Sequence, residues 1–185
     1  NLLGAEQHGH MDAVGYDMYC RLLNDAVRVR RGEKEEEIFD TSLDLNINAY
    51  IPAEYIKNEE QRLDMYKKIS YISNRDDYFD VQEEIEDRYG NIPKSVYTLL
   101  EAALLKARAH GKDILAVAEK GKNVVITFKG DAKINTDRLM TVITRGKGRY
   151  MFTQAAEPYI TIKPDYKNGE TGFEAVEKFL DDIEG

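Results

Sequence analysis

Cysteine and long apolar runs are scarce in this sequence. Cys20 is the only cysteine among 185 residues, so an internal disulfide and any multi-cysteine metal site are excluded. No apolar run approaches the ~20 residues that a membrane-spanning helix needs, and no N-terminal segment resembles a signal peptide. These features predict a cytoplasmic location and no membrane partner. The chain begins at Asn1 instead of Met, so we expect a fragment or a processed form.

Local motifs for catalysis and for cofactor binding are missing as well. The sequence contains neither Gly-x-x-x-x-Gly-Lys-[Ser/Thr] nor Gly-x-Gly-x-x-Gly, and no local Ser/His/Asp or Cys/His set. The glycine-rich run 146–149 is too short to cradle a phosphate, so we interpret it as a turn. Glu6, His8 and His10 would share one face of a strand, but neither a strand pattern nor a fourth ligand accompanies them. We therefore predict no catalytic residue, cofactor or metal in this chain.

The net charge of −8 is unevenly distributed along the chain. Segment 33–102 carries 18 acidic and 8 basic residues, whereas segment 103–150 carries 4 acidic and 11 basic residues. The overall sign disfavours non-specific phosphate binding, but a basic block at 106–149 leaves a local patch open. Because Tyr150 and Phe152 adjoin it, a single-stranded nucleic-acid surface is one hypothesis. Lysines protecting a solvated sheet edge are the interpretation that we favour. The block includes Lys120, Lys122, Lys129, Lys133, Arg145, Lys147 and Arg149.

Hydrophobic periodicity predicts a helical first half. An apolar stripe predicts a helix over 15–31, and the alternation of apolar residues over 43–47 predicts a strand. Helix starts are expected after Asn58, after Asn74 and at Pro93. The first of these three helices is expected to bury Leu63, Tyr66 and Ile69.

The second half has the pattern strand-strand-helix-strand-strand-helix. Its expected elements are strands at 114–117 and 124–128, a helix capped by Asn135, strands at 150–152 and 159–162, and a helix capped by Thr171 with Glu174. Segregation of helices from strands predicts an α+β fold, with an N-terminal helical segment followed by helices packed on a small antiparallel or mixed sheet of four to five strands. We expect an adaptor segment at 1–32, a charged linker at 33–42 and an α+β domain at 43–185.

The most informative stretch surrounds the end of the helix that follows Asn74. Tyr78, Val81, Ile85 and Tyr89 form its apolar stripe, and Gly90 stands where a helix cap prefers positive φ.

Three charged residues of this helix, Glu84, Asp87 and Arg88, project from one flank beside that stripe, and we call them the charged trio. One interpretation is a solvated face with a Glu84–Arg88 pair worth a few tenths of a kcal/mol. The other is a rigid array of two carboxylates and a guanidinium that docks on another surface. Their spacing alone leaves both open.

These residues also carry a family resemblance. Residues 84–93 read Glu-Ile-Glu-Asp-Arg-Tyr-Gly-Asn-Ile-Pro. They resemble the pattern Glu-Leu-x-Asp-Arg-Phe-Gly-x-x-Pro in the C-terminal domain of the bacterial transcription-repair coupling factors, the Mfd family. Ile85 and Tyr89 are conservative replacements that leave the charged trio intact. Residues 4–9 and 14–23 are similar to the stretch that follows the second motor lobe in the Mfd and RecG families.

The resemblance implies a regulatory, non-catalytic domain of an ATP-driven double-stranded DNA translocase. Such a parent displaces stalled RNA polymerase and recruits the repair protein UvrA, and the parent, not this fragment, would bind ATP and Mg²⁺. The domain would pack on the parent's UvrB-like module and mask its UvrA-binding surface, with Glu84, Asp87 and Arg88 making the polar contacts. The alternative is a nucleic-acid-binding module that uses the basic block at 106–149.

Overall fold

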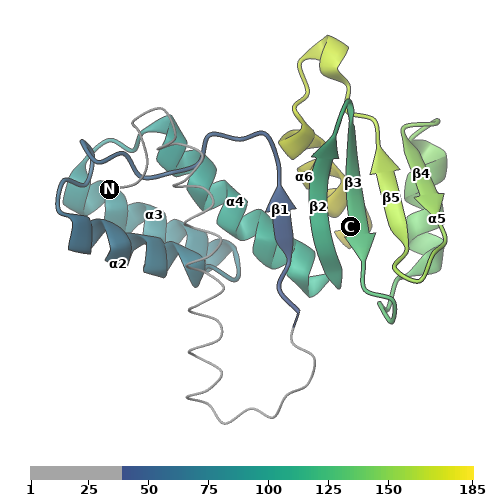
Figure 1. Ribbon diagram of the computed structural model, residues 1–185, viewed down its shortest axis with the longest axis horizontal. Coiled ribbons are helices and arrows are strands. Elements are labelled where there is room, and N and C mark those ends of the chain that lie inside the picture. The colour runs from purple at the N-terminus through teal and green to yellow at the C-terminus, as the bar shows by residue number, and fades with distance from the viewer. Residues whose placement is uncertain (1–38) are drawn as a thin grey trace, which may run out of the picture. The chain divides into compact units, whose positions relative to one another are not determined.

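The computed structural model describes residues 39–185, so segment 1–32 and the helix expected at 15–31 lie outside the described residues. Five helices, one 3₁₀ turn and a five-stranded sheet make up the described part (Figure 1). The predicted α+β class is confirmed. The elements in order are β1 (Ser42–Asp44), α2 (Glu59–Ser70), α3 (Arg75–Tyr89), α4 (Lys94–Gly111), β2 (Ile114–Lys120), β3 (Asn123–Phe128), α5 (Thr136–Arg145), β4 (Tyr150–Thr153), β5 (Tyr159–Ile162), η2 (Tyr166–Asn168) and α6 (Gly172–Glu184).

The described chain divides into two compact units. Residues 48–107 form one, which we call the helical unit, and residues 39–47 with 108–185 form the other, the sheet unit. The division falls within α4. The linker at 33–42 and the domain at 43–185 stay predictions of the sequence.

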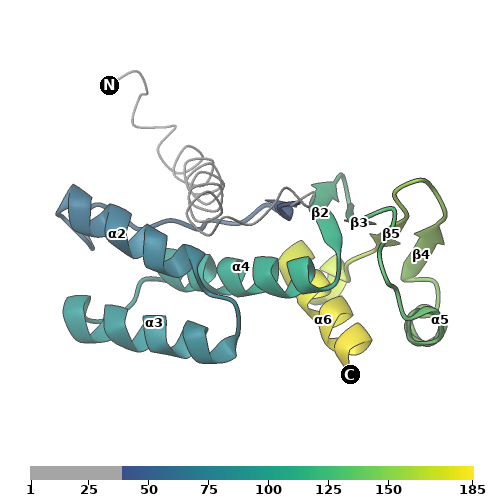
Figure 2. The ribbon, with the colours of Figure 1, turned by 90° about the horizontal axis from the view of Figure 1, so that it is seen from below.

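In the helical unit, α2 and α3 lie side by side (Figure 2). Asn58 caps α2 as expected, because its side chain accepts a hydrogen bond from the amide of Gln61 at 2.9 Å. The buried face of α2 is Met65, Tyr66 and Ile69. The expectation that Leu63 is buried was wrong, since its residue surface is 48% exposed. Leu63 lies about 200° around the helix from Met65 at 100° per residue, on the outer face.

Helix α3 begins and ends where the sequence predicts. The Asn74 side chain accepts from the Asp77 amide at 2.8 Å, and Gly90 ends the helix with φ of 83°. Of the predicted apolar stripe only Ile85 is fully buried, and the others are half-buried. Pro93 stands one residue before α4, where its carbonyl accepts from the following turn.

The sheet unit contains a mixed sheet in the order β1-β2-β3-β5-β4. β1 pairs parallel with β2, and all other neighbours pair antiparallel. Helices α5 and α6 lie against the same face of the sheet (Figures 1 and 2). The strand expected over 43–47 stops at Asp44, because the chain then turns with the Ile47 amide bonded to the Leu45 carbonyl at 2.9 Å.

The core of the sheet unit is built around α6. Phe179 is fully buried, and its ring centroid lies 5.6 Å from that of Tyr150 on β4. Thr171 caps α6 as predicted, because its hydroxyl accepts from the Glu174 amide at 3.1 Å; the hydroxyl also donates to the Glu174 carboxylate at 3.1 Å. No helix within residues 39–185 is both long and apolar enough to cross a membrane.

Candidate functional site

The charged trio occupies the last turns of α3 in the helical unit. Asp87 and Arg88 are exposed, and the Glu84 side chain is 36% exposed. Their positions follow from the helical period, because Ile85 is buried and turns this flank of α3 outward. The three side chains therefore stand at the surface of the unit that carries them.

Glu84 has a different partner from the one its spacing predicts. Its carboxylate pairs with the Lys68 ammonium of α2 at 2.5 Å, and not with Arg88. The Arg88 guanidinium instead lies 5.1 Å from the centre of the Tyr89 ring, a cation–π contact. The Asp87 side chain makes no hydrogen bond or ion pair with any residue in the described range 39–185. The trio thus offers one shared carboxylate, one unshared carboxylate and a guanidinium held on an aromatic face.

Tyr55 anchors the end of α3 beneath these side chains. Its hydroxyl donates to the Gly90 carbonyl at 2.8 Å, and its ring centroid lies 6.0 Å from that of Tyr89. Burial raises the pKa of Tyr55, and the nearby Glu86 carboxylate raises it further. The phenol therefore remains a neutral donor at physiological pH and holds the helix end in place. Sequence reasoning missed Tyr55 and Lys68, because no local spacing links them to α3.

A hollow of about 310 Å³ lies beside the trio. Arg88 contributes to it from α3, and the rest of its lining comes from α2 and the residue after it. We call it the α2–α3 hollow. Its lining residues are Asp64, Met65, Lys67, Lys68, Tyr71 and Arg88.

The basic block belongs mostly to the sheet unit. Acidic residues of segment 151–185 form ion pairs with two of its arginines. Arg108 bonds Asp181 at 2.6 Å and Glu184 at 3.1 Å, and Arg149 bonds Glu170 at 2.5 Å. Burial acts to lower the pKa of Arg108, but its bonds to Glu184 and Asp181 raise it overall. These two guanidiniums are therefore committed within the fold, which weakens the nucleic-acid hypothesis.

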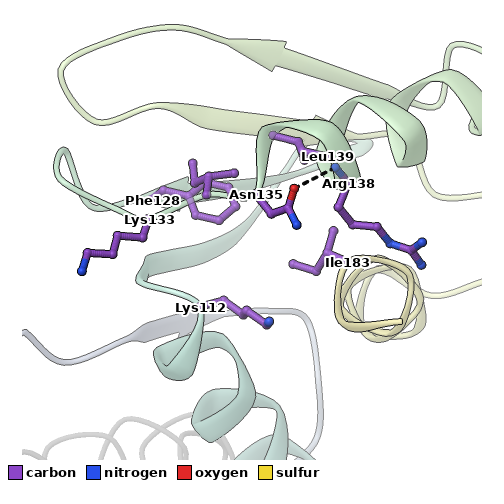
Figure 3. Close-up of a pocket in the computed structure, with 8 residues that line it drawn as sticks. Lys112, Phe128, Lys133, Asn135, Arg138, Leu139 and Ile183 are labelled. Carbon is purple, nitrogen blue, oxygen red and sulfur yellow. Dashed lines mark hydrogen bonds between the residues drawn. The ribbon is translucent and has the colours of Figure 1, made fainter.

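Other members of the block line a small cavity of about 100 Å³ (Figure 3). Lys112, Lys133 and Arg138 stand around an apolar wall formed by residues such as Phe128 and Ile183. Arg138 is already engaged, since its Nε donates to the Asp182 carbonyl at 2.7 Å. Figure 3 shows the Lys133 side chain pointing away from the other labelled side chains. The cations are thus dispersed around the cavity and do not converge on one point.

The minor motifs have simpler outcomes. The run 146–149 forms the turn between α5 and β4, as predicted, with positive φ at Lys147 and Gly148. The candidate ligands Glu6, His8 and His10 lie outside the described residues, as does Cys20. Within residues 39–185 no group of three or more His, Cys, Asp or Glu side chains is arranged to hold a metal ion.

Comparison with known proteins assigns the class. Residues 45–139 match the model of the TRCF domain family, a segment that contains the whole of the charged trio and the α2–α3 hollow. In solved structures, the fold is similar to the "C-terminal domain of transcription-repair coupling factor", with a TM-score of 0.64, 25% identity, and coverage of 79% of this chain and 95% of that one. The chain belongs to the TRCF domain family.

Curated relatives place the similarity within longer proteins. The transcription-repair-coupling factor of Staphylococcus haemolyticus is 37% identical over 155 residues, which is 82% of this chain and 13% of the relative. That of Staphylococcus aureus is 37% identical over 154 residues, again 82% of this chain and 13% of the relative. The chain therefore spans about an eighth of the length of these relatives, and the resemblance seen in residues 84–93 is confirmed.

Proposed function

We propose that this chain is a non-catalytic regulatory domain of a transcription-repair coupling factor. It would act as a lock inside its parent, a cytoplasmic ATP-driven translocase on double-stranded DNA that acts on stalled RNA polymerase. In the closed state the domain binds the parent's UvrB-like module and masks the surface that UvrA uses. ATP and Mg²⁺ belong to the parent's motor.

The observation that carries this proposal is the exposed charged trio in a member of the TRCF domain family. Within residues 39–185 the Asp87 side chain makes no ion pair or hydrogen bond, and the Arg88 guanidinium makes no ion pair but lies over the Tyr89 ring, so both can bind another surface. A planar guanidinium beside carboxylates suits recognition of a surface that carries both signs of charge.

Charge pairs also suit a lock that must open. Electrostatic complementarity contributes more to specificity than to affinity, and loss of one partner from a desolvated pair weakens binding strongly. The Lys68–Glu84 pair is exposed, so exchanging it for a contact with the docked module costs the fold at most about 1 kcal/mol. The trio can therefore change partners without unfolding the helical unit.

The test uses the full-length parent and capture of UvrA. Glu84→Lys and Arg88→Glu are each expected to raise the captured UvrA at least about tenfold, because reversal replaces attraction by repulsion across the lock. Glu83→Lys is the matched control, since Glu83 is exposed on the same helix and lies outside the trio. Circular dichroism of each variant checks that the fold is retained. UvrA capture that stays at the wild-type level in both trio variants would reject the lock.

A second candidate function is nucleic-acid binding through the basic block, supported by Lys112 and Lys133, which line the cavity of Figure 3 and make no ion pair within residues 39–185. Titration of labelled single- and double-stranded DNA at two salt concentrations tests it. Micromolar, salt-sensitive binding that falls in a Lys112→Glu, Lys133→Glu double variant would favour this candidate. Absence of such binding would leave the lock as the better account.

A further inference from the structure

The α2–α3 hollow extends the surface of the charged trio onto a second helix. Arg88 lines it from α3, and Glu84 reaches its rim through the 2.5 Å bond to Lys68. The family pattern in residues 84–93 contains no residue of α2. Lys67, Lys68 and Tyr71 are therefore additions made by the packing of α2 against α3.

The charge of this hollow is positive. Three of its lining residues are cations and one, Asp64, is an anion, which leaves two positive charges. Glu84 neutralises one of them through Lys68, so one positive charge remains. Lys67 makes no ion pair with another residue of the described range, and neither does Arg88, whose guanidinium lies over the Tyr89 ring. One carboxylate entering the hollow would make the cluster neutral and give both cations a partner.

The exposed apolar surface of the hollow comes from Tyr71. Met65 forms part of the lining and is 1% exposed, whereas Tyr71 is 47% exposed. Leu63, Lys67 and Tyr71 follow one another at four-residue steps, so they form one outer stripe of α2 that Leu63 extends with 48% exposure. Tyrosine and arginine are enriched at the energetic centre of protein interfaces, and Tyr71 and Arg88 are both exposed and line the same hollow.

We propose that the α2–α3 hollow receives an aspartate or glutamate side chain of the module that the charged trio binds. Lys67 and Arg88 hold the carboxylate, and the Tyr71 ring covers the stem that carries it. This inference rests on the proposed lock. It adds a second point of attachment, the hollow, which is positively charged, whereas Asp87 is negatively charged. The docked module must then carry an acidic residue for the hollow close to a basic residue for Asp87.

The test again measures UvrA capture by the full-length parent. Lys67→Glu places a carboxylate in the hollow, and it is expected to raise capture about tenfold through repulsion of the incoming acid. Lys67→Met keeps an aliphatic stem without the charge and should give a smaller rise. The matched control is Lys57→Glu, the same charge change at an exposed lysine that precedes α2 and does not line the hollow, which should leave capture unchanged.

A charge-swap experiment identifies the occupant. Each exposed Asp or Glu of the UvrB-like module is changed to Lys in the Lys67→Glu background, and one such change is expected to restore masking of UvrA. Restoration by one acidic position supports the hollow as its receptor. If none restores masking, the occupant is not a carboxylate and the inference is overturned.

The outcomes separate this inference from the lock itself. If Glu84→Lys opens the parent while Lys67→Glu leaves capture at the wild-type level, the lock stands and the hollow has no part in it. If neither variant changes capture, the lock fails and the hollow fails with it. Thermal unfolding of each variant guards against a false opening, because an acid in the last turn of α2 opposes the helix dipole.

Discussion

The sheet unit and the helical unit use their charged side chains differently. In the sheet unit Arg108 and Arg149 are 13% and 16% exposed and are bound to carboxylates of their own unit. In the helical unit Asp87 and Arg88 are exposed. The paired Lys68 and Glu84 side chains are 45% and 36% exposed. The arginines of the sheet unit are paired within their unit, whereas Asp87 and Arg88 make no ion pair within residues 39–185. Predictions about stability should therefore separate the two units.

The largest effect is expected in the core of the sheet unit. Phe179→Ala removes a fully buried ring that packs on Tyr150, and it should lower the free energy of unfolding by about 3–5 kcal/mol. Urea denaturation measures the change. Leu63→Ala in the helical unit is the contrast, since Leu63 is exposed and should cost no more than about 0.5 kcal/mol. Equal costs would contradict the assignment of the cores.

Two equivalent charge removals test whether ion pairs of the two units differ in their contribution to stability. Glu170→Gln takes the charged partner from Arg149 in a site where both side chains are less than a fifth exposed, so a loss of about 1–3 kcal/mol is expected. Glu84→Gln weakens the exposed pair with Lys68 and should change stability by less than about 1 kcal/mol. Chemical denaturation of both variants gives the two values. If Glu84→Gln proves the more costly, the trio is structural and the lock loses its basis.

Replacing Gly90 tests how much the backbone conformation at the end of α3 contributes to stability. Gly90 has φ of 83° and ψ of −157°, a region that essentially only glycine adopts, so Gly90→Ala should cost about 1–3 kcal/mol. Gly111→Ala at the end of α4 is the control, because no atom lies within 4 Å of the added Cβ and φ is not positive. It should be neutral or stabilise by up to about 1 kcal/mol. Comparable effects of the two changes would mean that the end of α3 does not require a positive φ at position 90.

The smallest effect is expected from acid at the start of α3. Hydrogen bonds from the Ser73 hydroxyl and amide lower the pKa of Asp77 below its ordinary 3.8. The folded chain then binds fewer protons than the unfolded chain, so this stabilisation is present above about pH 4 and is lost as pH falls through the folded pKa. Asp77→Asn should flatten the pH dependence of the unfolding midpoint, whereas Asp76→Asn should not. An unchanged profile in Asp77→Asn would show that Ser73 does not stabilise the charge.

Local rules predicted much of the described fold. Asn58, Asn74, Asn135 and Thr171 cap helices as expected, because a side-chain oxygen satisfies an amide within three residues of it. Burial was less predictable. Leu63 was assigned to the core although Met65 fills that place, since several apolar residues on α2 allow more than one stripe.

In the candidate site, too, some features follow from local sequence and others from tertiary packing. The sequence alone determined which residues form the charged trio, the helix that carries them and the Gly90 stop, because helical spacing and caps depend on neighbours in the chain. Three features of the site come from tertiary packing: the pair between Glu84 and Lys68, the hydrogen bond from Tyr55 to Gly90, and the cationic hollow between α2 and α3. Those contacts join residues 16 to 35 positions apart. Their formation depends on how two helices pack, which no local pattern encodes.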